Sequence, residues 1–144
     1  MPTETALNDL THKIIGACIE VHRALGPGLL EKLYQECLCH ELDLRGIQYE
    51  KEPMIRFLYK GLPVSIDLRA DLIVEDQVVV ELKSVKDLHP VYEAQLMSYL
   101  KITGKPIGLL VNFHVSLLKD GIVRRTLDGL PEIVDESDDA QNYD

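Results

Sequence analysis

Two acidic residues and a lysine on neighbouring predicted strands have the types and spacing that chemistry would require. Asp71 lies in the run 68–74, and Glu81 and Lys83 lie in the run 78–84. Side chains alternate between the two faces of a strand, so Glu81 and Lys83 point the same way. Paired carboxylates can bind a divalent cation, and a lysine beside them can orient or deprotonate a water molecule. These residues therefore predict a metal-dependent hydrolytic site.

The turn between the two runs decides whether the carboxylates meet. If residues 75–77 form a three-residue hairpin loop, the residues that flank the loop pair with each other, and Asp71 falls opposite Glu81. By the same register Arg69 falls opposite Lys83. Directly opposed like charges destabilise a sheet unless something compensates them, and the oxygen ligands of carboxylates suit Mg²⁺. A two-residue turn would instead send the two carboxylates to opposite faces.

A simpler interpretation of the same residues is a solvated sheet face. Asp71 could pair with Arg69 or Lys83, and an isolated Glu-x-Lys occurs by chance in charged proteins. The surrounding pattern favours a site, because both strands are otherwise apolar and a predicted helix with Gln95 and Tyr99 follows them. These two residues are four apart and so share one helical face, where they could contact the site or a nucleic-acid strand.

Hydrophobic periodicity predicts the elements that must position these residues, in the order α-α-β-β-β-α-β-β. Apolar residues at three- and four-residue steps indicate helices, and a period near two between residues 48 and 85 indicates three antiparallel strands. The predicted helices cover 7–25, 29–45 and 91–103, with Pro90 in the first turn of the third, and the last two strands cover 107–113 and 121–127. We expect an α/β fold with a central mixed sheet flanked by helices.

Length and composition indicate one globular domain over residues 1–131 and an acidic tail over 132–144 that we expect to be disordered. The formal net charge is −9, but six acidic and no basic residues lie from Glu132 onward. The body still has no evident basic patch, which argues against avid, sequence-independent binding to DNA. Apolar stretches such as 107–111 are too short to cross a bilayer. Three cysteines without a signal pattern lead us to expect a cytoplasmic protein.

The segment 22–34 resembles the signature of the prokaryotic GxxExxY proteins. Gly28, Glu31 and Tyr34 occupy the positions that name this group. Further segments that resemble the same group are 70–74, 80–83 and 93–100. Together the segments span most of the chain, and the combination is specific where each piece alone is weak.

The GxxExxY group belongs to the PD-(D/E)XK nuclease superfamily, whose name describes a proline and an acid followed by a second acid and a lysine. Gln95 and Tyr99 are similar to a pair found in the RecB-like branch of that superfamily. One departure is that Ala70, not proline, precedes Asp71. The resemblance implies a restriction-endonuclease-like core.

The resemblance also implies a role for each matching residue. Asp71 and Glu81 would bind Mg²⁺ or Mn²⁺ with the main-chain carbonyl of Leu82, and Glu31 would complete the metal ligands. Lys83 would position the attacking water and stabilise negative charge that develops on the phosphate. The residues with implied supporting or substrate-binding roles are His22, Tyr34, Gln95 and Tyr99. For Glu31, a half-buried polar residue without a ligand role is the competing interpretation.

Two classes of function stay open at this stage. The first is a metal-dependent phosphodiester hydrolase, a nuclease that acts on DNA or RNA. The second is a binding or assembly module that keeps the nuclease fold without significant turnover, and a homo-oligomer is possible for either. A zinc site at Cys37, Cys39 and His40 is disfavoured, because adjacent positions diverge around one helix and no second cluster accompanies them.

Overall fold

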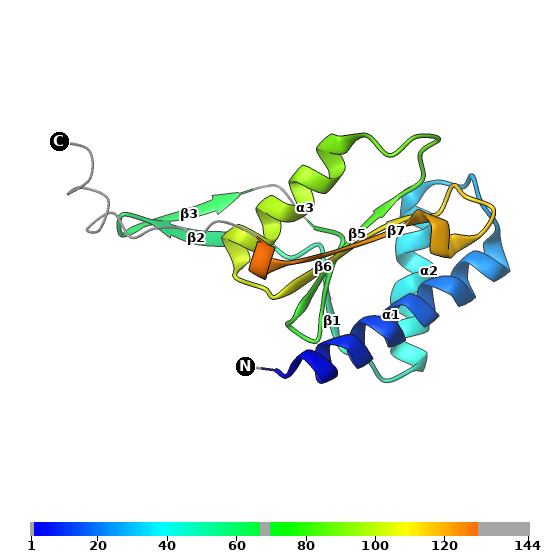
Figure 1. The fold of residues 1–144 in the computed structure, drawn as a ribbon, viewed down its shortest axis with the longest axis horizontal. Coiled ribbons are helices and arrows are strands. Elements are labelled where there is room, and N and C mark those ends of the chain that lie inside the picture. The colour runs from blue at the N-terminus through cyan, green and yellow to red at the C-terminus, as the bar shows by residue number, and fades with distance from the viewer. Residues whose placement is uncertain (1, 67–69, 130–144) are drawn as a thin grey trace.

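The protein has an α/β fold in which helices cover both faces of a five-stranded mixed sheet (Figure 1). The structure, a computed structural model, describes residues 2–66 and 70–129, so the tail predicted over 132–144 lies outside the described residues. The strands of the main sheet, in spatial order, are β1 (Tyr49–Lys51), β4 (Leu72–Val74), β5 (Val78–Lys83), β6 (Ile107–Asn112) and β7 (Ile122–Thr126). Strands β5 and β6 are parallel and the other neighbours antiparallel, which confirms the predicted fold class.

Two helices, α1 (Glu4–Leu25) and α2 (Glu31–Leu44), cover one face of this sheet. Helix α1 begins earlier than its apolar periodicity predicts, because the Thr3 hydroxyl caps it by accepting a hydrogen bond from the main-chain N–H of Ala6 at 3.0 Å. Gly26 ends the helix with a φ of 74°, a conformation that glycine adopts without strain.

Helix α3 (Pro90–Thr103) covers the opposite face. Pro90 occupies the first turn, and the His89 side chain accepts a hydrogen bond from the N–H of Val91 at 3.0 Å. Gly104 ends the helix in the left-handed conformation. The third predicted helix is therefore confirmed at both ends. Short 3₁₀ helices, η1 (Leu118–Gly121) and η2 (Leu127–Gly129), flank β7.

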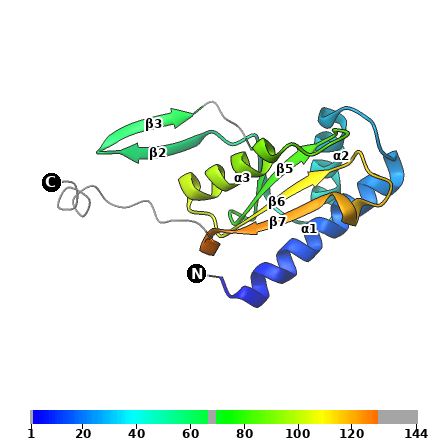
Figure 2. The same ribbon diagram turned by 45° about the horizontal axis from the view of Figure 1, so that its top comes forward.

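The segment between residues 48 and 85 contains five strands in the part that the structure describes, so the prediction of three was wrong. The two extra strands, β2 (Ile55–Tyr59) and β3 (Leu62–Ile66), form a hairpin of their own that is not part of the main sheet. The chain leaves the main sheet at Glu52, which has a φ of 48°. The next residue is a proline, which has no main-chain N–H to donate to a neighbouring strand. Figures 1 and 2 show the hairpin beside α3.

The register between β4 and β5 agrees with the predicted three-residue loop. Val74 pairs with Val78, and Leu72 pairs with Val80. Residues 75–77 form the turn, with Glu75 and Asp76 at positive φ. The expected alignment of Asp71 with Glu81 follows from this pairing. The expected partner of Lys83, Arg69, lies outside the described residues.

Alternation along the strands divides the core into two layers. Val78, Val80 and Leu82 of β5 pack with α1 and α2, whereas Val79 packs with Leu96 and other residues of α3. The side chains of Glu81 and Lys83 follow Val79 and therefore face α3. Within the described part of the chain, no helix is long and apolar enough to cross a membrane.

Candidate functional site

Three acidic residues lie in one row across neighbouring strands of the main sheet. The N–H of Glu52, just after β1, donates to the main-chain carbonyl of Asp71 at 2.8 Å. Asp71, just before β4, aligns in turn with Glu81 of β5. The row forms where β1 ends and β4 begins, so the protein brings three acidic residues to one position of the sheet.

Asp71 itself sits in a bend, although the sequence predicts a strand over 68–74. Its Oδ2 accepts a hydrogen bond from the N–H of Leu82 at 2.8 Å, and its own N–H donates to Oε1 of Glu81 at 3.1 Å. The Asp71 carboxylate thus accepts the hydrogen bond that the Leu82 N–H would donate to a main-chain carbonyl if β4 extended to this point. This side-chain contact explains why the ladder begins only at Leu72.

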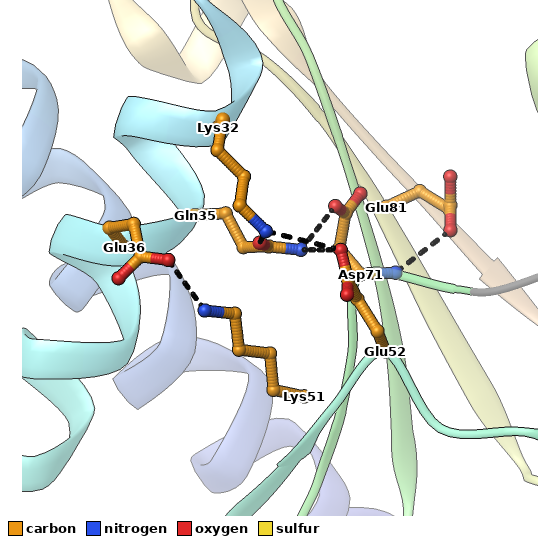
Figure 3. Close-up of polar contacts among 7 residues, drawn as sticks. All are labelled: Lys32, Gln35, Glu36, Lys51, Glu52, Asp71 and Glu81. Carbon is orange, nitrogen blue, oxygen red and sulfur yellow. Dashed lines mark hydrogen bonds and ion pairs between the residues drawn. The ribbon is translucent and has the colours of Figure 1, made fainter.

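The carboxylate of Asp71 also contacts helix α2. Its Oδ1 accepts a hydrogen bond from Nε2 of Gln35 at 2.9 Å. In a regular strand, Asp71 would share the α3 face with Ile73 and Glu81, as the sequence predicts. Because the chain bends, the Asp71 carboxylate instead turns toward Gln35, while Glu81 lies on the other side of the Asp71 main chain (Figure 3).

Gln35 and Glu52 are site residues that sequence reasoning missed. The Gln35 side chain is 2 % exposed, and it contacts Glu52 Oε1 at 3.4 Å as well as Asp71. Lys32 fixes the orientation of the Gln35 amide by donating to its Oε1 at 3.0 Å, and Lys32 also approaches Glu52 Oε1 at 3.4 Å (Figure 3). A signal existed: Gln35 stands three residues before the buried Leu38, so a polar side chain occupies the core-facing stripe of α2.

The electrostatic environment shifts the pKa values of the three acids in different directions. Hydrogen bonds from Gln35 and then from Lys32 hold the pKa of the Glu52 carboxyl below its usual range. Burial raises the pKa of Asp71, and the negative charge of Glu31 adds to this effect. Burial, followed by the charge of Asp71, raises the pKa of Glu81 to about 8. The charged forms of Asp71 and Glu81 are therefore compensated only in part by the protein.

Lys83 is a cationic residue whose charge acts on both carboxylates. Its charge lowers the pKa of both Asp71 and Glu81, although the effect is smaller than that of burial. The Lys83 side chain is half-buried, and its Nζ lies 4.4 Å from the centre of the Tyr92 ring on α3. A cation over an aromatic face is attracted to the ring quadrupole. Tyr92 thus supports Lys83 beside the two carboxylates.

Helix α3 contributes one of its two predicted residues to the site. Burial raises the pKa of Tyr99 to about 12, and the charges of Glu81 and Asp71 act in the same direction. Tyr99 therefore lies within electrostatic range of both carboxylates. Gln95 is exposed on the same helix. Glu31 is also exposed, at the first turn of α2, but its charge reaches Asp71 and Glu81.

Tyr34 and His22 support the polypeptide around the site. The Tyr34 hydroxyl donates to the carbonyl of Gly26 at 2.6 Å and accepts from the N–H of Leu29 at 3.0 Å, which fixes the α1–α2 connection. The Tyr34 ring is fully buried and stacks on Phe113. His22 Nε2 lies 2.8 Å from the carbonyl of Val115. Their burial fits a supporting role better than contact with a substrate.

Comparison with known proteins places this arrangement in a family. The family model described as the PD-(D/E)XK nuclease superfamily matches residues 8–125, which include every site residue named above. The chain belongs to the PD-(D/E)XK nuclease superfamily. A solved structure titled "Crystal structure of SSO0001" is 24% identical, with a TM-score of 0.46 over 77% of this chain and 55% of that one. The match thus spans about half of that chain. A comparison with curated proteins gave no match.

The residue types in the name of the PD-(D/E)XK superfamily occur here in the same order. Asp71 has the type of the first acid, and Glu81-Leu82-Lys83 has the types and spacing of the second acid, the variable residue and the lysine. Ala70 replaces the proline, and its side chain is buried in the cluster that packs against α3.

Members of the superfamily generally use divalent metals, which bind through oxygen donors such as the carboxylates of Asp71 and Glu81. Within residues 2–66 and 70–129, no group of three or more His, Cys, Asp or Glu side chains is arranged to hold a metal ion. Asp71 and Glu81 offer hard oxygen donors, and burial raises the pKa of both carboxyls, with the charge of Asp71 adding to the effect at Glu81. Each oxygen that accepts a hydrogen bond here retains a second lone pair. These residues therefore fit a hard divalent cation.

The main-chain carbonyl of Leu82 lies on the correct side of β5 to join this donor set. The carbonyl of Lys83 accepts a hydrogen bond from Phe113 and so points toward β6. Successive residues of a strand direct their main-chain groups to opposite sides, so those of Leu82 point toward Asp71. The hydrogen bond from the Leu82 N–H to Asp71 agrees with this direction.

The raised pKa of Glu81 predicts how stability depends on pH in metal-free protein. The carboxyl titrates near 4.5 in the unfolded chain and near 8 in the folded protein, so its contribution is complete below 4.5 and is lost as pH rises through 8. We expect the free energy of unfolding in EDTA to fall by on the order of 4 kcal/mol between about pH 5 and pH 9. Asp71 acts in the same direction.

Urea denaturation at several pH values measures this effect. Glu81→Gln should flatten most of the decline, since the amide keeps the shape of the side chain but does not ionise. Wild type and Glu81→Gln with the same pH profile would show that Glu81 does not carry a raised pKa in the folded protein.

Proposed function

We propose that this protein is a metal-dependent nuclease that hydrolyses phosphodiester bonds of DNA or RNA. One observation carries the proposal: the half-buried carboxylate of Asp71 and the buried carboxylate of Glu81, both with raised pKa values, lie beside a half-buried lysine, Lys83, in a superfamily named for these residue types. A surface ion pair would leave the carboxylates solvated and their pKa values near normal. Burial of two acids beside one lysine costs stability and favours a functional explanation.

In this proposal Asp71, Glu81 and the Leu82 carbonyl would hold Mg²⁺ or Mn²⁺, with Glu31 as a further ligand. Such a cation, when bound, supplies Lewis acidity at the scissile phosphate and makes water more acidic. Gln35 orients the Asp71 carboxylate through its hydrogen bond at 2.9 Å. Removal of a residue that hydrogen-bonds a metal ligand in this way commonly lowers metal affinity or activity by about 10- to 100-fold.

Lys83 performs the other task in the proposal. Its ammonium group offers positive charge where negative charge accumulates on the phosphate, and it can hold water by hydrogen bonding. Tyr92 limits the freedom of the lysine through the contact at 4.4 Å. Tyr99, which lies within electrostatic range of both carboxylates, and the exposed Gln95 of α3 are proposed to contact the nucleic-acid strand. We also propose that the chain belongs to the GxxExxY group and to the RecB-like branch.

An assay of purified protein tests the proposal. Labelled single-stranded DNA, double-stranded DNA and RNA should be cleaved, in at least one case, with Mg²⁺ or Mn²⁺ and not with EDTA. Asp71→Asn, purified in parallel, controls for contaminating nucleases, because it removes a proposed ligand. Cation binding without cleavage of any substrate would instead favour a binding module that keeps the nuclease fold. Equal activity of Asp71→Asn would refute the proposed site.

A further inference from the structure

The β2–β3 hairpin starts and ends at the carboxylate site. It is inserted between Glu52 and Asp71, whose main chains are joined by a hydrogen bond of 2.8 Å. At its base, Ile55 is buried against residues of α3, including Leu100. From there the hairpin extends past α3, away from the main sheet (Figures 1 and 2). A ligand in the site would therefore meet the base of this hairpin, and a longer ligand could follow it outward.

The tip of the hairpin exposes apolar and aromatic surface on both faces. Tyr59 is 55% exposed and pairs with Leu62, which is 60% exposed, while Leu58 on the opposite face is 71% exposed. A solvated two-stranded hairpin is marginally stable, and exposed apolar side chains that gather in one place commonly mark a binding surface. The tip thus has the composition of a contact surface.

The charge of the hairpin identifies the partner that suits it. Between Pro53 and Ile66 the sequence contains Arg56 and Lys60 and no acidic residue, although the formal net charge of the whole chain is −9. Lys60 lies in the turn, with its Nζ 5.2 Å from the centre of the Tyr59 ring. A second copy of the hairpin would bring like charges together, whereas phosphates are complementary to them.

We propose that the β2–β3 hairpin is a docking arm for an unpaired nucleic-acid strand that enters the carboxylate site. A base of the strand stacks on Tyr59, Lys60 contacts a phosphate, and Arg56 adds positive potential within the screening length. This inference rests on the nucleic-acid binding that the proposed function includes. Tyr59 lies seven residues beyond Glu52, about 23 Å along an extended strand, or roughly seven nucleotides of a strand whose bases stack at the 3.4 Å spacing of a duplex.

The test measures affinity as a function of strand length. Fluorescence anisotropy of labelled single-stranded DNA of 5 and 20 nucleotides, in EDTA and in Mn²⁺, is compared for the full chain and its variants. Tyr59→Ala should weaken binding of the 20-mer by about tenfold and leave the 5-mer unchanged, and Tyr59→Phe should restore the affinity. Arg56→Gln with Lys60→Gln should lower the salt slope by at least about 0.7, the value for the one phosphate that Lys60 contacts.

Matched controls separate the arm from general surface effects. Leu44→Ala removes another exposed apolar side chain, and Lys13→Gln with Arg23→Gln removes one lysine and one arginine from α1, on the other face of the sheet. These controls should bind the 20-mer like wild type. Circular dichroism and sedimentation are recorded for every variant, so that unfolding or a change of oligomeric state is detected.

Each outcome decides one of the two proposals. The docking arm is supported if Tyr59→Ala binds the 20-mer no more tightly than the 5-mer while its mass in sedimentation is unchanged. This holds even if no substrate is cleaved, and in that case only the nuclease proposal fails. Cleavage by wild type together with unchanged affinity in the arm variants leaves the nuclease proposal standing and overturns the arm. The arm is also overturned if wild type binds neither strand, if the controls lose as much affinity, or if Tyr59→Ala only converts a dimer to a monomer.

Discussion

Lys83→Ala is expected to lower the turnover number for phosphodiester cleavage by about a thousandfold, while the affinity for Mg²⁺ or Mn²⁺ changes little. The lysine supplies positive charge to the transition state but is not a metal ligand. Its Nζ lies over the Tyr92 ring of α3, on the opposite face of β5 from Val80 and Leu82, so the truncation leaves the packing of these two residues untouched. Single-turnover cleavage of a labelled oligonucleotide and calorimetric titration of the metal measure the two quantities separately.

Lys86→Ala is the matched control, because Lys86 is an exposed lysine in the loop that follows β5. It should cleave like wild type. If Lys83→Ala retained the wild-type rate, Lys83 would have no part in the reaction. If it lost metal affinity and cleavage in equal measure, its role would be to maintain the carboxylates and not to stabilise the transition state.

Glu81→Gln is expected to abolish cleavage and to weaken divalent-cation binding by at least about a hundredfold, which exceeds the usual effect of removing an outer partner. The amide can still accept the hydrogen bond that the Asp71 N–H donates at 3.1 Å, so the bend is preserved. The variant also removes a buried carboxyl whose pKa is raised to about 8. It should therefore be more stable than wild type at alkaline pH without metal.

Glu50→Gln provides the control, since Glu50 is an exposed acid on β1. It should leave both metal affinity and cleavage unchanged. Loss of cleavage in Glu81→Gln with undiminished metal affinity would mean that the cation binds elsewhere. Loss of stability at every pH would mean that Glu81 supports the fold and does not serve the site.

The sequence was sufficient to predict the alignment of the first acid with the second. The apolar runs on either side of residues 75–77 allow one register in which both strands bury their valines, and that register brings Asp71 level with Glu81. Helix α3 was equally accessible, because Pro90 and Gly104 mark its ends. These features depend on local chemistry and on the period of the hydrophobic pattern.

Other features depend on contacts between distant residues and escaped prediction. The bend at Asp71 arises because its carboxylate takes the N–H of Leu82 and contacts Gln35, which lies 36 positions earlier in the chain. The separate hairpin arises from the break at Glu52, and the period of two continues on both sides of it. A two-residue period identifies strands but does not tell which sheet they join.

Anomalous diffraction from a crystal soaked in Mn²⁺ tests the central claim most directly. The account predicts one strong peak about 2.1 Å from oxygens of both Asp71 and Glu81, with the Leu82 carbonyl as a further ligand, and predicts its loss in Glu81→Gln crystals. A soaked crystal with no peak at these carboxylates, at a Mn²⁺ concentration that supports cleavage in solution, would contradict it.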